Sequence, residues 1–284
     1  MIHLKKIVII LSVLIFAPDL AVALEKPNGL LNLKAALLVD IDSGKILYKQ
    51  NADKPIQPAS LAKILVLYLV NEDIRAGKVN LNDMVKISAK AVNTNSGSKM
   101  LYKEGEEVRL EDLIKIMAIL SANDATVAIA EHLAGSVDNF VARMNAKAKE
   151  LGMKQSHFVN PHGLSDKHQF STARDIFILS RDYLQRFPDS INIHSIQYFT
   201  YNSVTYHNTN TLLQENGDVD GLKTGYVRAA GYHLVVTAKR GDKRLMAVVL
   251  GAKNPKIRTS QTKKLLDFGF RMIGEKDQSS MVGA

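Results

Sequence analysis

The sequence predicts an α+β fold in which an antiparallel sheet, built from both termini of the chain, carries an inserted helical lobe. Two hairpin patterns, one near each end, predict the sheet, because apolar β-prone runs flank turn residues in both. Between the hairpins lie several stretches with helical periodicity. Strands at the two ends with helices between them are typical of α+β proteins.

The first hairpin is expected from residues 35–41 and 45–49, around an Asp-Ser-Gly turn, and the second from residues 232–239 and 244–250, around Arg-Gly-Asp-Lys. Helices are expected over residues 61–70, 110–120, 125–133, 137–151, 172–184 and 259–268. No Gly/Ser-rich or Pro-rich linker interrupts the chain. We therefore expect one domain over residues 24–272, followed by a short polar tail at residues 273–284.

The first 23 residues predict an exported protein. Lys5 and Lys6 precede an apolar run at residues 7–16, and Ala21-Val22-Ala23 has the small residues that a signal peptidase recognises. The run is too short to span a bilayer, which takes ~20 apolar residues. We expect residues 1–23 to be a cleaved signal peptide, leaving no stable membrane anchor. The mature protein would then act in the bacterial periplasm or cell-wall space.

The composition excludes several classes of protein. With 37 basic and 28 acidic residues, a net charge of +9 and 46% apolar residues, the chain is globular rather than disordered. The positive charge is dispersed, so a generally basic surface is expected and no nucleic-acid partner. There are no cysteines and no His-Glu-x-x-His pattern, so neither a metal nor another cofactor is expected.

A Ser-x-x-Lys pattern stands at the start of the first predicted helix. Lys63 follows Ser60 by one helical turn and lies on the same face, so its amine can reach the hydroxyl. A serine hydroxyl is a poor nucleophile unless a base accepts its proton, and a lysine accepts one only when it is neutral. Ser60 is also a favoured helix cap, and the pattern alone leaves both interpretations open.

Two further motifs follow in the chain. Ser121-Ala122-Asn123 falls between two predicted helices, where its polar side chains would either face a cleft or cap the second helix. Lys223-Thr224-Gly225 precedes the second hairpin and offers a carboxylate ligand a cation, a hydroxyl and close backbone approach. An exposed strand with a turn would explain the same residues, so each motif alone decides nothing.

Together and in this order, the motifs form the Ser-x-x-Lys, Ser-x-Asn and Lys-Thr-Gly set of the penicillin-recognising serine enzymes. The chain resembles the low-molecular-weight penicillin-binding proteins, the serine-type D-alanyl-D-alanine carboxypeptidases of bacterial cell walls. The resemblance implies a fold like that of the β-lactamases and D,D-peptidases. Stretches that carry it beyond the motifs are residues 35–45, 159–164, 171–175, 208–210 and 264–270.

The resemblance implies an acyl-enzyme cycle on the stem peptide of peptidoglycan, the expected partner. Ser60 would attack the carbonyl between two D-alanines, and Lys63, kept neutral by burial and by Lys223, would take its proton. Ser121 would carry a proton to the departing amine, and Asn123 would hydrogen-bond the substrate backbone. β-Lactam inhibitors are expected to acylate the same serine.

Substrate binding is implied for the third motif as well. Lys223 and Thr224 would hold the carboxylate, and Gly225 would allow the strand to come close. Backbone amides of Ser60 and Tyr226 would form the oxyanion hole. The class A β-lactamase pattern Glu-x-x-x-Asn is missing between the second and third motifs, so a long-lived penicilloyl adduct is expected.

Two residues depart from the family pattern: Ala122 stands where a glycine is usual, and Thr209 where some members carry a carboxylate-binding arginine, a loss that Arg228 could offset. The family's second domain and amphipathic C-terminal helix are not expected here. Two alternatives to a carboxypeptidase stay open: a D,D-endopeptidase that cuts cross-links with the same site, and a catalytically silent wall-binding protein.

Overall fold

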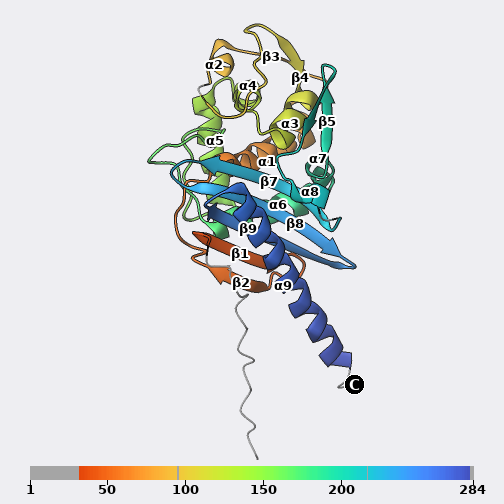
Figure 1. Ribbon diagram of the computed structural model, residues 1–284. Coiled ribbons are helices and arrows are strands. Elements are labelled where there is room, and N and C mark those ends of the chain that lie inside the picture. The colour runs from red at the N-terminus through yellow and green to blue at the C-terminus, as the bar shows by residue number, and fades with distance from the viewer. Residues whose placement is uncertain (1–31, 95, 216, 282–284) are drawn as a thin grey trace, which may run out of the picture.

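The computed structural model describes residues 32–94, 96–215 and 217–281. The predicted signal peptide, residues 1–23, lies outside the described residues. A five-stranded antiparallel sheet forms the centre, with strand order β2-β1-β9-β8-β7. In Figure 1 the long helix α9 crosses one face of the sheet, and helices α1 to α5 form a lobe on the other side. The predicted α+β class, with a sheet built from both ends of the chain, is confirmed.

Both predicted hairpins are present in the sheet. β1 (Ala35–Asp40) pairs with β2 (Ile46–Gln50), and β8 (Gly231–Arg240) pairs with β9 (Lys243–Ala252). Pairing of β1 with β9 joins the two ends of the chain, and β7 (Val219–Val227) adds the edge strand next to β8. The third motif therefore lies on the edge of the sheet, where one side of the strand has no sheet neighbour.

Each predicted helix is found, with ends shifted by a few residues except at the C-terminal end of α9. The structure adds three short helices and two small two-stranded antiparallel sheets, β3 (Met84–Lys86) with β4 (Glu107–Arg109) and β5 (Tyr198–Tyr201) with β6 (Val204–His207). The helices are α1 (Ala62–Arg75), α2 (Ala89–Val92), α3 (Leu110–Ile119), α4 (Asn123–Ala134), α5 (Val137–Glu150), α6 (Ala173–Arg186), α7 (Ile191–His194), α8 (Leu212–Glu215) and α9 (Pro255–Met281).

Helix α9 is longer than its apolar pattern indicates. It runs from Pro255 to Met281, through most of the stretch that the sequence predicts as a polar tail. No proline follows Phe268, so nothing in the sequence forces the helix to stop where its apolar positions end. Over the described residues, no helix is both long and apolar enough to cross a membrane.

Alternating strand residues give the sheet a core on each face. Leu37 and Val39 of β1 pack into the core shared with the helical lobe, whereas Ala36 and Leu38 pack into the core under α9. The N-terminal part of helix α1 lies inside the lobe, where every residue from 62 to 70 is buried, whereas its last residues reach the surface. A helix that is apolar on all sides is typical of such a central position. The serine of the first motif therefore lies at the start of a buried helical stretch.

Two histidines are buried in their neutral form beneath this site. His233 on β8 accepts a hydrogen bond from the Gly251 amide at Nδ1, 2.9 Å away, while its Nε2 lies 3.0 Å from the Gln57 carbonyl oxygen. His194 on α7 lies between a tyrosine hydroxyl and the backbone of β7. Burial lowers the pKa of each imidazole to about 4. A proton added to Nδ1 of His233 would displace the Gly251 hydrogen bond.

We expect the protein to lose stability as the pH falls below about 6.5, the pKa of a histidine in an unfolded chain. The folded pKa of both imidazoles is lower, so protons bind preferentially to the unfolded chain, and the free energy of unfolding decreases down to about pH 4. The loss should be at most roughly 3 kcal/mol per histidine. Urea unfolding at several pH values measures it. His233→Gln should flatten the curve, whereas substitution of the exposed His207 should not.

Candidate active site

The Ser-x-x-Lys motif forms a contact at the start of α1. Ser60 lies in a 3₁₀ turn, Ala59–Leu61, which continues directly into the helix. The Nζ atom of Lys63 lies 3.0 Å from the Ser60 Oγ. No side-chain capping hydrogen bond is made at the start of either the turn or α1, so Ser60 is not a helix cap. The hydroxyl is left facing the lysine amine.

The backbone around Ser60 is held in a strained and closely packed conformation. Ala59 has a φ of 51°, a left-handed value that costs a non-glycine residue about 1 kcal/mol or more. Two glycines approach from other segments. A Cβ at Gly163 would lie 1.9 Å from the Ala59 carbonyl oxygen, and one at Gly225 would lie 3.3 Å from the Ser60 amide nitrogen. Strand β7 therefore passes directly beside the Ser60 amide.

The Lys63 amine is fully buried and surrounded by neutral groups. It lies 2.7 Å from the Asn123 Oδ1 and 2.8 Å from the His162 carbonyl oxygen, both of which accept its hydrogen bonds. A neutral amine has two N–H groups for these acceptors and one lone pair left for the Ser60 hydroxyl. Burial, together with the positive charge of Lys223, holds the pKa of Lys63 well below its usual range. The arrangement suits a lysine that accepts the serine proton.

Lys223 and Thr224 lie on the edge strand β7. Lys223 is buried, and its burial, with the nearby charge of Arg258, lowers its pKa to about 7. The Thr224 hydroxyl donates to the Thr209 hydroxyl, 2.8 Å away. A bound anion would favour the charged form of this lysine. Together the two residues offer a cation and a hydroxyl next to Ser60.

The Ser-x-Asn motif lies in the turn between α3 and α4. Ser121 has a φ of 64° and is 9% exposed, while Asn123 is the first residue of α4. No side chain caps α4, so the capping interpretation of this motif is wrong. The Asn123 side chain bonds Lys63 through its oxygen and donates from Nδ2 to the Ser96 carbonyl, 2.9 Å away. One N–H of its amide is left for a ligand.

Tyr226 and two cations complete the surroundings of β7. The Tyr226 ring is half exposed and stacks on Tyr232, with ring centroids 4.2 Å apart. Arg228, which the sequence suggests as a substitute for the missing family arginine, is exposed in the β7–β8 turn. Arg258 of α9 is 7% exposed, and its Nε atom has no hydrogen-bond partner among the described residues. Its side chain, rather than that of Arg228, is the buried cation that acts on Lys223.

Two residues near the site, Arg258 and Asp124, are not among the predicted site residues. No local pattern marks Arg258, because its position depends on how α9 packs against the sheet. Asp124 has a local signal, since it directly follows the motif asparagine. In the part of the chain that the structure describes, no group of three or more His, Cys, Asp or Glu side chains could hold a metal ion.

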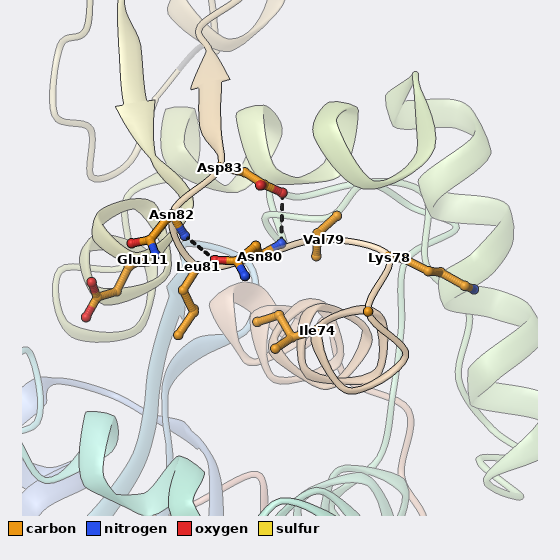
Figure 2. Close-up of a pocket in the computed structure, with 9 residues that line it drawn as sticks. Ile74, Lys78, Val79, Asn80, Leu81, Asn82, Asp83 and Glu111 are labelled. Carbon is orange, nitrogen blue, oxygen red and sulfur yellow. Dashed lines mark hydrogen bonds between the residues drawn. The ribbon is translucent and has the colours of Figure 1, made fainter.

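A separate hollow lies at the other end of α1. Figure 2 shows it between Ile74, near the end of α1, and the segment that carries Leu81 and Asp83, with Glu111 beside it. The Asp83 carboxylate accepts a hydrogen bond from the Asn80 amide there. Roughly 20 Å of helix separates this end from Ser60. The hollow contains none of the motif residues, so it is not the site of the predicted chemistry.

The fold and a site with a serine hydroxyl beside a buried lysine amine are together typical of a serine peptidase. The sequence profile of the D-alanyl-D-alanine carboxypeptidases, Peptidase S11, matches residues 22–254. The chain belongs to this family. The resemblance drawn from the motifs is thereby confirmed.

Known relatives support the assignment along most of the chain. D-alanyl-D-alanine carboxypeptidase DacC of Escherichia coli is 41% identical over 268 residues, which are 91% of this chain and 66% of DacC. The chain thus spans about two thirds of this curated relative. Penicillin-binding protein 5 of Haemophilus influenzae superposes with a TM-score of 0.82 at 39% identity, covering 84% of this chain and 71% of that one. Penicillin-binding protein D2 of Listeria monocytogenes, solved with cefotaxime bound, has a TM-score of 0.80 at 32% identity, over 86% of this chain and all of that one.

Proposed function

We propose that this protein is an exported serine-type D-alanyl-D-alanine carboxypeptidase, which removes the terminal D-alanine from peptidoglycan stem pentapeptides in the periplasm or cell-wall space. The observation that carries the proposal is the buried Lys63 amine, 3.0 Å from the Ser60 hydroxyl and close to the positive charge of Lys223. Membership of the carboxypeptidase family supports the choice of substrate.

In the first half of the reaction, the Ser60 oxygen attacks the carbonyl carbon between the two D-alanines while its proton passes to Lys63. The carbonyl oxygen takes up the electron pair and is stabilised by the amides of Ser60 and Tyr226. The C–N bond then breaks as Ser121 delivers a proton to the leaving amine, and Ser121 is reprotonated with the proton that Lys63 took from Ser60. In the second half, water attacks the ester carbonyl carbon and gives up a proton to Lys63; the ester C–O bond then breaks, and the proton returns to the Ser60 oxygen.

The terminal carboxylate of the substrate distinguishes a carboxypeptidase site from a general peptidase site. We assign its recognition to Lys223 and Thr224, with Arg258 as the second cation behind the strand. Burial of Arg258 with an unpaired Nε supports this assignment, because buried guanidinium groups are normally hydrogen-bonded. The Asn123 amide is assigned to the substrate backbone through its remaining N–H.

Product analysis by mass spectrometry tests the proposed function. The protein without residues 1–23 is incubated with a stem pentapeptide and, separately, with a cross-linked muropeptide dimer. Release of D-alanine from the pentapeptide, with the dimer left intact, supports a carboxypeptidase. Cleavage of the dimer in preference to the pentapeptide would show an endopeptidase. Failure to act on either, together with no covalent labelling by penicillin, would show a catalytically silent wall-binding protein.

We expect the penicilloyl adduct on Ser60 to be released slowly compared with turnover of a D-alanyl-D-alanine peptide. In class A β-lactamases a glutamate activates the deacylating water, and no carboxylate is hydrogen-bonded to Ser60 or Lys63 among the described residues. Glu131 binds Ser88 and Glu150 binds Lys147. Intact mass recorded over time, after free drug is removed, measures the release. Rapid return of the unmodified mass over many turnovers would indicate a β-lactamase instead.

Restoring the arginine that some relatives carry should strengthen carboxylate binding. Thr209 is exposed and lies in contact with Thr224, so Thr209→Arg would place a guanidinium beside the substrate carboxylate. We expect KM for the pentapeptide to fall by roughly tenfold, the effect of about 1.4 kcal/mol, with kcat changed little. Thr205→Arg, on the exposed β5–β6 hairpin, is the matched control for added charge. Equal effects of the two variants would contradict a local contact.

A further inference from the structure

Asp124, the residue after the motif asparagine, is buried and fully engaged at the N-terminal end of α4. It is 1% exposed. Its Oδ1 accepts a hydrogen bond from the Ala125 amide at 2.8 Å, and its Oδ2 accepts from the amides of Met100 and Leu101 at 2.8 and 3.0 Å. Backbone amides and the N-terminal end of a helix together suit a negative charge. Asp124 is therefore a buried carboxylate that holds backbone amides from two segments of the chain.

The segment that Asp124 holds, residues 96–101, forms a loop that we call the rim loop. Asn123 binds the same loop twice, through its backbone amide to the Ser98 carbonyl at 2.7 Å and through its side chain to the Ser96 carbonyl at 2.9 Å. Gly97 leaves no space there, since an added Cβ would lie 2.5 Å from the Asn123 Nδ2. The other end of the Asn123 amide accepts from Lys63. A continuous chain of contacts thus runs from the rim loop to the base.

The conformation of Leu101 shows how firmly the rim loop is held. Leu101 has a φ of 62° and is 78% exposed, an unfavourable backbone conformation for a leucine that gains little from burial. Such strain persists only where surrounding contacts determine the backbone. The hydrogen bond from the Leu101 amide to Asp124 is the contact that holds it.

Asp124 also differs in charge from the other groups near the base. Lys223 of β7 lowers the pKa of Lys63, and Arg258 of α9 in turn acts on Lys223. His162, whose pKa is lowered to about 3 by burial and by Lys63, is neutral at working pH. Asp124 on α4 is the group that acts in the opposite direction and raises the pKa of Lys63. The three hydrogen-bond partners of the Lys63 amine carry no charge.

We propose that Asp124 is a positioning residue of this site: its carboxylate ties the rim loop to the Ser-x-Asn motif and supplies a negative charge near the buried Lys63. The inference rests on the proposed function. Through Asn123, the tether holds Lys63 at hydrogen-bond distance from Ser60. Through its charge, Asp124 keeps Lys63 a strong enough base to accept the serine proton.

The test is the rate of acylation by a fluorescent penicillin, measured against pH. Asp124→Asn removes the charge at nearly constant size, so Lys63 becomes neutral at lower pH. The acidic limb of the pH profile should therefore shift to lower pH by about one unit. The plateau rate should fall by about tenfold, because the base is weaker and less well placed. Asp138→Asn, which removes an exposed carboxylate from the first turn of α5, should leave both unchanged.

Asp124→Glu keeps the negative charge but displaces the carboxylate from the amides of the rim loop. The plateau rate of acylation should therefore fall, while the acidic limb of the pH profile stays at the wild-type position. An acidic limb for Asp124→Asn that coincides with the wild type would overturn the inference. If Asp124→Asn does not fold, a wild-type plateau rate for Asp124→Glu overturns it instead. No labelling of the wild-type protein at any pH would overturn the proposed function as well, so the two failures are distinguishable.

Discussion

Ser60→Ala is expected to abolish both β-lactam labelling and release of D-alanine. Alanine has no oxygen to form the ester, and the second motif offers no substitute, because no hydrogen bond joins Ser121 to Lys63 among the described residues. The rate should fall by about 10⁴-fold or more, as it does when a serine hydrolase loses its nucleophile. Intact mass after incubation with penicillin measures the adduct, and peptide mapping of the wild type should locate it on Ser60.

A matched serine substitution separates this effect from general destabilisation. Ser136 caps α5 by accepting a hydrogen bond from the Asn139 amide at 3.1 Å. Ser136→Ala should cost about 1 kcal/mol of stability and leave acylation unchanged. A wild-type adduct on the Ser60→Ala protein, or an adduct mapped to another residue, would show that the nucleophile is assigned wrongly.

Lys63→Arg is expected to reduce acylation by about 10³-fold, within the range for loss of a general base. Arginine keeps the positive charge but does not give up its proton, so it has no lone pair to accept the proton of Ser60. Labelling with a fluorescent penicillin, quenched at a series of times, measures the rate of acylation, and circular dichroism checks the fold. Lys54→Arg, at an exposed position before α1, is the control and should label as the wild type does.

The outcome of the Lys63 substitution also tests the physical cause of its basicity. If charge alone were sufficient, the arginine variant would retain its rate, and the proton would have to pass to another group. Normal acylation by Lys63→Arg would therefore remove lysine from the base role.

The sequence by itself determined the features that depend on neighbouring residues. The two hairpins follow from turn residues between β-prone runs, and the helices follow from apolar periodicity. The contact of Ser60 with Lys63 is of the same kind, because helix geometry places residues three apart on one face. The order of the three motifs was sufficient to indicate the family.

Features without a local signal were decided by the tertiary structure. The short strand pairs β3–β4 and β5–β6 have too few residues for a recognisable pattern, and α9 continues beyond its apolar positions because no residue ends it. Distant segments meet at the site: α4 brings Asn123 to Lys63, and β7 brings Gly225 to the Ser60 amide. Contacts of this kind depend on how the layers pack, which the local pattern of residues does not specify.

The chemical character of the site was decided in the same way. In an unfolded chain a lysine side chain is positively charged at neutral pH and cannot accept a proton. Lys63 becomes suited to accept a proton because packing buries it near Lys223, while Arg258 on the last helix has the same effect on Lys223. Asp124 follows the motif in sequence, but only the fold places the rim loop on its carboxylate. Residue types and their order specify the possible reaction, whereas burial and long-range electrostatics set the protonation states that it requires.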